Sequence, residues 1–353
     1  FSVPGQGYLG LTTLSTPSVK LNPDLKPEKV TSTEFGLEFA VLDNKLNVDL
    51  SIYDITTTDL IYNVPVPAAT GYSFFKQNIG EVSNKGIEIN VGASLVQTES
   101  FSWNTSLFYA KNENKLVSLS EGLDTVVYNT TNSGNASIRA TVGGGIGDIF
   151  GSVWDTDDSG RNLVNAEGIP IASSPDNLLG NAQPDWLGGW SNTLSFGDIS
   201  LSFLIDARIG GQVFSRTSSG LDASGVSERS LEYRANGVTL DAINTGTNSA
   251  NTANITGQQY WGAMSGIAEN YIYDQDNIRL REFSLGYRLP GLSSLGIQSG
   301  SIQLIGRNLF FLSKSADDID PEAMLGTGLG AQGFASYNMP TLRSLGINLT
   351  LNF

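Results

Sequence analysis

The chain has 353 residues, of which 40 % are apolar and 16 % charged, and a net charge of −15. It contains no cysteine and no histidine, which excludes disulfide and thiol chemistry and removes both the commonest general base and the commonest transition-metal ligand. A chain this acidic is also a poor nucleic-acid binder, because affinity for phosphate comes mainly from Lys and Arg.

The first third of the chain alternates apolar and polar residues with a period of two. Residues 31–42 show this pattern, a short turn follows, and residues 45–62 repeat it. Two further runs cover residues 84–96 and 101–112. Alternation of this kind predicts β-strands with one apolar face.

The same alternation resumes after a long polar interval, at residues 186–197 and 199–213. Three more runs follow at 277–290, 300–310 and 340–353. The sequence therefore predicts nine strands, most of them about 10–14 residues long, which is the length that crosses a bilayer when a strand is tilted. No run of 18 or more apolar residues occurs, so a membrane protein of this sequence would have to be a β-barrel.

The connections between these strands alternate in length. Those after the first, third, fifth and seventh strands are short turns, and the others are long and rich in Asn, Ser, Thr and Gly. Short periplasmic turns and long extracellular loops are typical of outer-membrane barrels. The long connections, expected to be structureless, are at about 63–83, 113–185, 214–276 and 311–339.

The two faces of the predicted strands differ in chemistry. One carries Leu, Ile, Val and Phe, and the other mixes acidic, amide, hydroxyl and glycine residues. A transmembrane barrel turns its apolar face toward lipid and its polar face toward the lumen, whereas a soluble β-sandwich would bury the apolar face. We expect the lumen to be faced by eight charged residues: Glu34, Glu38, Asp49, Glu88, Asp206, Arg208, Glu282 and Arg288.

The number of strands predicts an incomplete barrel. Residues 1–29 form an expected extracellular loop segment, and residues 30–353 carry the nine strands with their loops. Nine strands that begin on the long-loop side cannot close on themselves, and an open edge in lipid would leave unpaired backbone groups. We therefore expect strands outside this sequence to complete the barrel.

Several short motifs, in one order along nearly the whole chain, resemble the SusC/RagA group of TonB-dependent receptors. The first is Asn22-Pro23-Asp24-Leu25-Lys26-Pro27-Glu28 followed by Glu34-Phe35-Gly36. The others are Asn84-Lys85-Gly86-Ile87-Glu88, Pro184-Asp185-Trp186-Leu187-Gly188-Gly189, Arg279-Leu280-Arg281-Glu282, Gly306-Arg307-Asn308-Leu309-Phe310 and Asp320-Pro321-Glu322.

This resemblance implies an all-β, antiparallel barrel of about 22 strands around an N-terminal plug, of which the chain would supply the last nine strands. The plug and the earlier strands are absent from this sequence, and the resemblance implies that the inward-facing charged residues contact the plug. It also implies a multi-pass protein of the outer membrane, a SusD-like surface lipoprotein as partner, and import of glycans or peptides driven through TonB. A receptor for a small chelate such as a siderophore or cobalamin remains an alternative, and so does a passive or structural barrel. No enzymatic activity and no organic cofactor is expected.

One loop carries a candidate calcium site. Asp155, Asp157 and Ser159 precede Gly160, a spacing that can place oxygen ligands on one side of a tight turn. The bidentate acid expected at the twelfth position is missing, because that residue is Ala166. The alternative is a solvated acidic turn.

Overall fold

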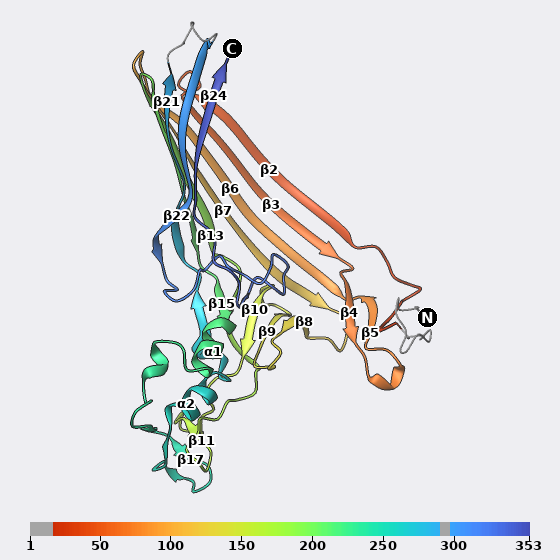
Figure 1. Ribbon diagram of the computed structural model, residues 1–353. Coiled ribbons are helices and arrows are strands. Elements are labelled where there is room, and N and C mark those ends of the chain that lie inside the picture. The colour runs from red at the N-terminus through yellow and green to blue at the C-terminus, as the bar shows by residue number, and fades with distance from the viewer. Residues whose placement is uncertain (1–16, 290–296) are drawn as a thin grey trace, which may run out of the picture.

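The structure is a computed structural model that describes residues 17–289 and 297–353. Residues 1–16 of the predicted extracellular segment lie outside the described residues. Figure 1 shows one long curved sheet with the short turns gathered at one end and the long connections at the other.

The sheet, which we call the wall, contains nine strands in chain order, and all eight pairings are antiparallel. The predicted all-β antiparallel fold is confirmed. The wall strands are β2 (Lys29–Val41), β3 (Leu46–Thr58), β6 (Gly80–Gln97), β7 (Phe101–Leu119), β13 (Trp186–Phe196), β14 (Ile199–Ile209), β21 (Asn277–Leu289), β22 (Ser299–Lys314) and β24 (Ser344–Asn352).

The strand ends differ from the sequence prediction on the long-loop side. β6 and β7 together extend several residues further than the alternation indicated, because a small core closes over their ends. Val82 and Leu116 are buried there against Ala140 and Ile146, which belong to the connection after β7. These contacts hold β6 and β7 together beyond the residues where apolar and polar side chains alternate in the sequence.

The apolar face of the wall is not covered by other parts of the chain. Phe35 is 62 % exposed, Leu285 42 % and Leu349 57 %, while Leu201 is only half-buried. The apolar face also has a sharp end: Ile52 pairs with Ile87, and two residues further Asp54 and Lys85 form an ion pair of 2.7 Å. An exposed apolar band bordered by charge is the arrangement of a transmembrane barrel, not of a soluble sandwich.

The long connections are folded, which corrects the expectation of structureless loops. They contain β4 (Ile61–Pro65), η2 (Ala68–Thr70), β5 (Phe74–Asn78), β8 (Thr125–Thr130), β9 (Ala136–Thr141), β10 (Asp148–Gly151), β11 (Leu163–Val164), β12 (Asn177–Asn181), β15 (Gln212–Ser215), β16 (Val238–Thr239), β17 (Ile243–Asn244), β18 (Ser249–Ala250), β19 (Asn254–Ile255), β20 (Ile272–Asp274) and β23 (Phe334–Ala335). In the segment before the wall, β1 (Val19–Lys20) pairs with β5. The helices are α1 (Arg216–Ala223), η3 (Arg229–Leu231), α2 (Gly257–Met264) and η4 (Ala268–Tyr271). Within the part of the chain that the structure describes, no helix is long and apolar enough to cross a membrane.

Three of these connections fold together, and we call them the loop assembly (residues 120–185, 210–276 and 315–343). Its main core joins Ile138 and Ile149 from the first connection to Phe214 and Tyr271 from the second and Phe334 from the third. The rings of Phe214 and Phe334 meet edge to face at 6.0 Å. The loop assembly thus has the buried core that the wall lacks.

Local signals explain the helices of the loop assembly. Ser215 accepts a hydrogen bond from the Ser218 N–H and caps α1. Thr256 and Gln259 form a capping box at the start of α2. Such caps satisfy backbone N–H groups that a short helix would otherwise leave unpaired, and they stabilise the first turns of α1 and α2.

Candidate functional site

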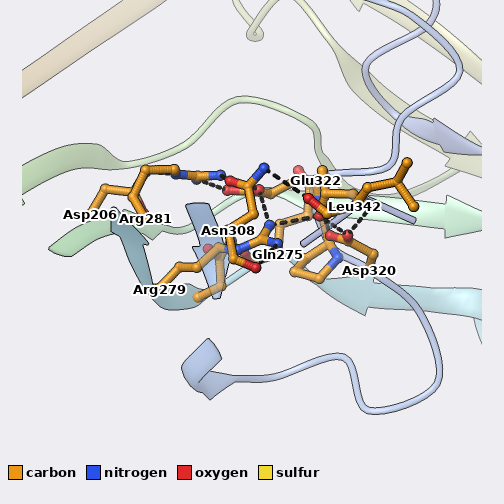
Figure 2. A network of polar contacts seen from close by, with 11 residues as sticks. Asp206, Gln275, Arg279, Arg281, Asn308, Asp320, Glu322 and Leu342 are labelled. Carbon is orange, nitrogen blue, oxygen red and sulfur yellow. Dashed lines mark hydrogen bonds and ion pairs between the residues drawn. The ribbon is translucent and has the colours of Figure 1, made fainter. Parts of the chain in front are cut away.

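A polar network joins the third part of the loop assembly to the polar face of the wall (Figure 2). Arg281 Nε donates to Asp206 Oδ2 at 2.6 Å, and its Nη1 donates to Glu322 Oε2 at 3.0 Å. Arg279 Nη1 donates to the same Glu322 Oε2 at 2.7 Å. Glu322 therefore holds two arginines at once, and Arg279 is only 3 % exposed in its side chain. Charge-assisted bonds in such a shielded setting are stronger than surface ion pairs.

A β-bulge brings the two arginines to this face. Leu204 of β14 pairs with Glu282, and the next residue, Ile205, pairs with Leu280, so Arg281 is an extra residue in β21. The extra residue reverses the alternation, and Arg279 then lies opposite Asp206. Strict alternation would instead have put both arginines on the apolar face.

Further hydrogen bonds fix the loop that carries Glu322. Gln275, fully buried, donates to the Pro321 carbonyl at 3.3 Å. The Thr341 N–H donates to Asp320 at 2.9 Å. Asn308, at a positive φ of 52°, accepts from Arg281 at 3.0 Å and donates to the Leu342 carbonyl at 3.3 Å. The Asp320-Pro321-Glu322 motif is thus the point at which this loop is anchored to the wall.

A cavity of about 710 Å³ lies beside the network, between the wall and this loop. Asp206, Arg208 and Arg281 line it from the wall, and Pro321 and Glu322 line it from the loop. Its volume falls in the range of small-molecule sites, roughly 300–1,000 Å³.

The residues predicted to face the lumen divide into three groups. Asp206 belongs to the network, and Arg208 lines the cavity beside it. Glu282 pairs with Arg307 at 3.0 Å, further along the same face. The rest lie apart from the network. Glu34 accepts a hydrogen bond from Ser51 at 2.5 Å, Glu38 and Asp49 line a second cavity of about 520 Å³, Glu88 lies on neighbouring β6, and Arg288 lies near the short turns.

The two aspartates of the calcium candidate contact groups of their own turn. Asp157 accepts hydrogen bonds from the Ser159 and Arg161 N–H groups, and Arg161 adds an ion pair of 2.7 Å. These donors lower the pKa of Asp157, the Arg161 backbone N–H most of all. Asp155 accepts from the Thr156 N–H. Within residues 17–289 and 297–353, no group of three or more His, Cys, Asp or Glu side chains is placed to hold a metal. The guanidinium of Arg161 pairs with Asp157, and calcium binding by Asp155, Asp157 and Ser159 stays a prediction.

Sequence reasoning missed Arg279, Arg281 and Glu322 as site residues. They were present only as parts of short motifs, with no indication that the motifs meet in space. An Arg-x-Arg pair on the apparently apolar register of β21 was the one available signal, because arginine is costly on a lipid-facing position.

An exposed apolar band, a polar inner face and connections of alternating length together define a segment of a transmembrane β-barrel. The comparison with known families agrees: the family described as "TonB dependent receptor-like, beta-barrel" matches residues 1–212. This is more than half of the chain, and the chain belongs to that family.

Curated relatives are similar over most of this chain. TonB-dependent receptor P3 of Formosa agariphila is 26 % identical over 94 % of the chain and 35 % of the relative. TonB-dependent receptor SusC of Bacteroides thetaiotaomicron is 24 % identical over 86 % of the chain and 30 % of the relative. The chain therefore spans about a third of the length of the curated relatives it matches.

Solved structures show the same fold. The structure described as the RagAB peptide transporter matches all of this chain and 38 % of its own chain, with a TM-score of 0.71 and 21 % identity. The RagAB peptide importer in the "open-open" state matches with a TM-score of 0.67 and 20 % identity.

Proposed function

We propose that this chain forms part of the wall of a TonB-dependent importer in the Gram-negative outer membrane, which takes up glycan or peptide fragments. The observation that carries the proposal is the exposed apolar face of the wall, seen at Phe35, Leu285 and Leu349. Such a face is stable only against hydrocarbon. The names of the relatives, among them SusC, support uptake rather than catalysis.

The two edges of the wall support completion by other strands. Within the described residues, β2 pairs only with β3, and β24 pairs only with β22. Each unpaired backbone group would cost several kcal/mol in lipid. Under the proposal, strands outside this chain pair with both edges and close the barrel. A plug inside it would face Glu34, Glu38 and Glu88.

Partners follow from the same proposal. The loop assembly stands at the end of the wall where a SusD-like lipoprotein would cover the barrel, and it carries exposed apolar side chains such as Val226 and Leu231. TonB would act from the opposite, short-turn side, through residues outside this chain.

The test is uptake by cells that lack the full-length protein, with TonB inactivated in a parallel strain. We expect both strains to lose growth on a polymer fragment as sole carbon source and to keep growth on the monomer. Loss of growth on a chelate of iron or on cobalamin instead would identify a small-chelate receptor. Uptake that persists without TonB would identify a passive barrel and refute the proposal.

A further inference from the structure

The cavity between the wall and the Asp320-Pro321-Glu322 loop contains an arginine, Arg208, that forms no ion pair with the described residues, although Glu322 lines the same cavity. Arg279 and Arg281 each form an ion pair with Glu322, whereas no carboxylate of the described residues lies within 4 Å of the Arg208 guanidinium. Arg208 Nη2 donates to two neutral acceptors, the Ala182 carbonyl at 2.8 Å and Gln275 Oε1 at 2.9 Å.

Among the described residues, the hydrogen bonds of this guanidinium are those of Nη2. Arg208 Nε is shielded from solvent and has no hydrogen-bond partner in the described residues. A buried N–H without an acceptor is unfavourable, and more so on a charged group. Arginine is the residue of choice for binding carboxylates in such settings, because it stays charged and presents several donors in fixed directions.

The floor of the cavity is apolar, although it lies on the polar face of the wall. Phe108, Leu187 and Leu204 occupy positions of the polar register and line the cavity beside Arg208. Gly189 lies opposite both Phe108 and Asp206 and adds no side chain, so space stays open above this row. Met324 adds an apolar group from the loop side.

A guanidinium that forms no ion pair among the described residues, next to an apolar floor, matches a ligand with two parts. We propose that this cavity binds an organic carboxylate that carries an apolar substituent: Arg208 takes the carboxylate, and Phe108 and Leu204 take the substituent. The inference rests on the proposed function, because it places the site on the path that an imported fragment follows. It names one feature of the cargo that the importer would retain.

The experiment uses the full-length protein in detergent and isothermal titration calorimetry with two matched probes. N-acetyl-leucyl-leucine carries the free carboxylate, and its C-terminal amide is the neutral counterpart. We expect the acid to bind at least about tenfold more tightly than the amide, since a charge-assisted bond to a shielded guanidinium is worth more than a neutral one. Glucuronate, a carboxylate without an apolar substituent, should bind more weakly than the acid.

Two variants and a control test the role of Arg208. Arg208→Gln should abolish the preference for the acid over the amide, and Arg208→Lys should retain part of it. Arg307→Gln is the matched control, because Arg307 lies on the same face of the wall but already pairs with Glu282. This variant should keep the preference unchanged.

Three outcomes would overturn the inference: equal binding of acid and amide by the wild type, no binding of either, or a preference that survives in Arg208→Gln. Lower thermal stability of Arg208→Gln with an unchanged preference would also overturn it and would assign Arg208 a structural role. Binding in detergent needs no transport. If uptake proves independent of TonB but the preference holds, only the proposed function fails.

Discussion

The wall exposes apolar side chains on its outer face, whereas the loop assembly buries them in a core. In the wall, Leu285 and Leu349 stand exposed on the outer face. In the loop assembly, Ile149, Phe214 and Tyr271 are fully or almost fully buried. The same types of side chain thus face lipid in the wall and are shielded from water in the loop assembly. The loop assembly follows the rules of a soluble domain, and the wall inverts them.

The largest expected effect is in the core of the loop assembly. Phe214→Ala removes a ring that packs against Tyr271 and Phe334, and it should cost about 3–5 kcal/mol, as for other buried aromatic residues. Phe283→Ala on the outer face of the wall is the control and should cost less, because lipid chains can refill the space. Thermal unfolding would measure both variants, and protease sensitivity of residues 210–276 would locate the loss in Phe214→Ala. Equal losses would show that the two regions do not differ in their solvent.

The second effect compares a charge added to the outer face of the wall with one added to the surface of the loop assembly, and here the wall should lose more stability. Leu285→Arg puts a charge on the outer face of the wall and should destabilise the barrel by about 2–4 kcal/mol if this position lies near the middle of the bilayer. Leu231→Arg, at a position of the loop assembly that is 60 % exposed, should change stability by less than about 0.5 kcal/mol. Folding into lipid vesicles under a urea gradient measures both values. A harmless Leu285→Arg would contradict the assignment of the outer face to lipid.

The third effect concerns the link between the two regions. Glu322→Gln removes the carboxylate that binds Arg279 and Arg281 and should cost about 1–3 kcal/mol, mostly by leaving shielded guanidinium groups unpaired. Hydrogen exchange should then rise in residues 315–343 while the wall stays protected. Glu282→Gln breaks the more exposed pair with Arg307 and should cost less than about 1 kcal/mol. Unchanged exchange in Glu322→Gln would mean that the loop is held by its other contacts.

The smallest effect is a pH dependence of the turn around Asp157. Its pKa is lowered by the N–H and guanidinium of Arg161, so ionised Asp157 stabilises the turn above the unfolded value of about 3.9, and this contribution is lost as pH falls through the lower, folded value. Trp154, whose indole N–H donates to the Leu163 carbonyl at 2.8 Å, reports on this turn. Its fluorescence should shift only below about pH 4. Asp157→Asn should show no such shift, and a wild-type shift centred above pH 5 would contradict the assignment.

The sequence predicts the wall much better than the loop assembly. Nine strands appear in the expected order because a strand with one lipid face must alternate at every second residue, as from Phe35 to Val41. The long connections gave no periodic signal. Their core joins Ile138, Phe214 and Phe334, which are distant in the chain, and no local pattern reports such contacts.

The candidate site was only partly accessible to sequence reasoning. Alternation assigned Asp206 to the polar face, where Arg281 binds it, but it would assign Arg279 and Arg281 to the apolar face, since a single extra residue in β21 reverses the pattern. The partner of these arginines, Glu322, comes from a different connection about 40 residues away.

The amino-acid sequence by itself determined the antiparallel wall, its two faces and the division into short and long connections, because lipid imposes a constraint on every second residue of each strand. Only the tertiary structure decided how the loop assembly folds, where β21 carries its bulge, and that Glu322 and Arg208 border one cavity. These features depend on contacts between residues far apart in the chain, and such contacts leave no periodic trace in the sequence.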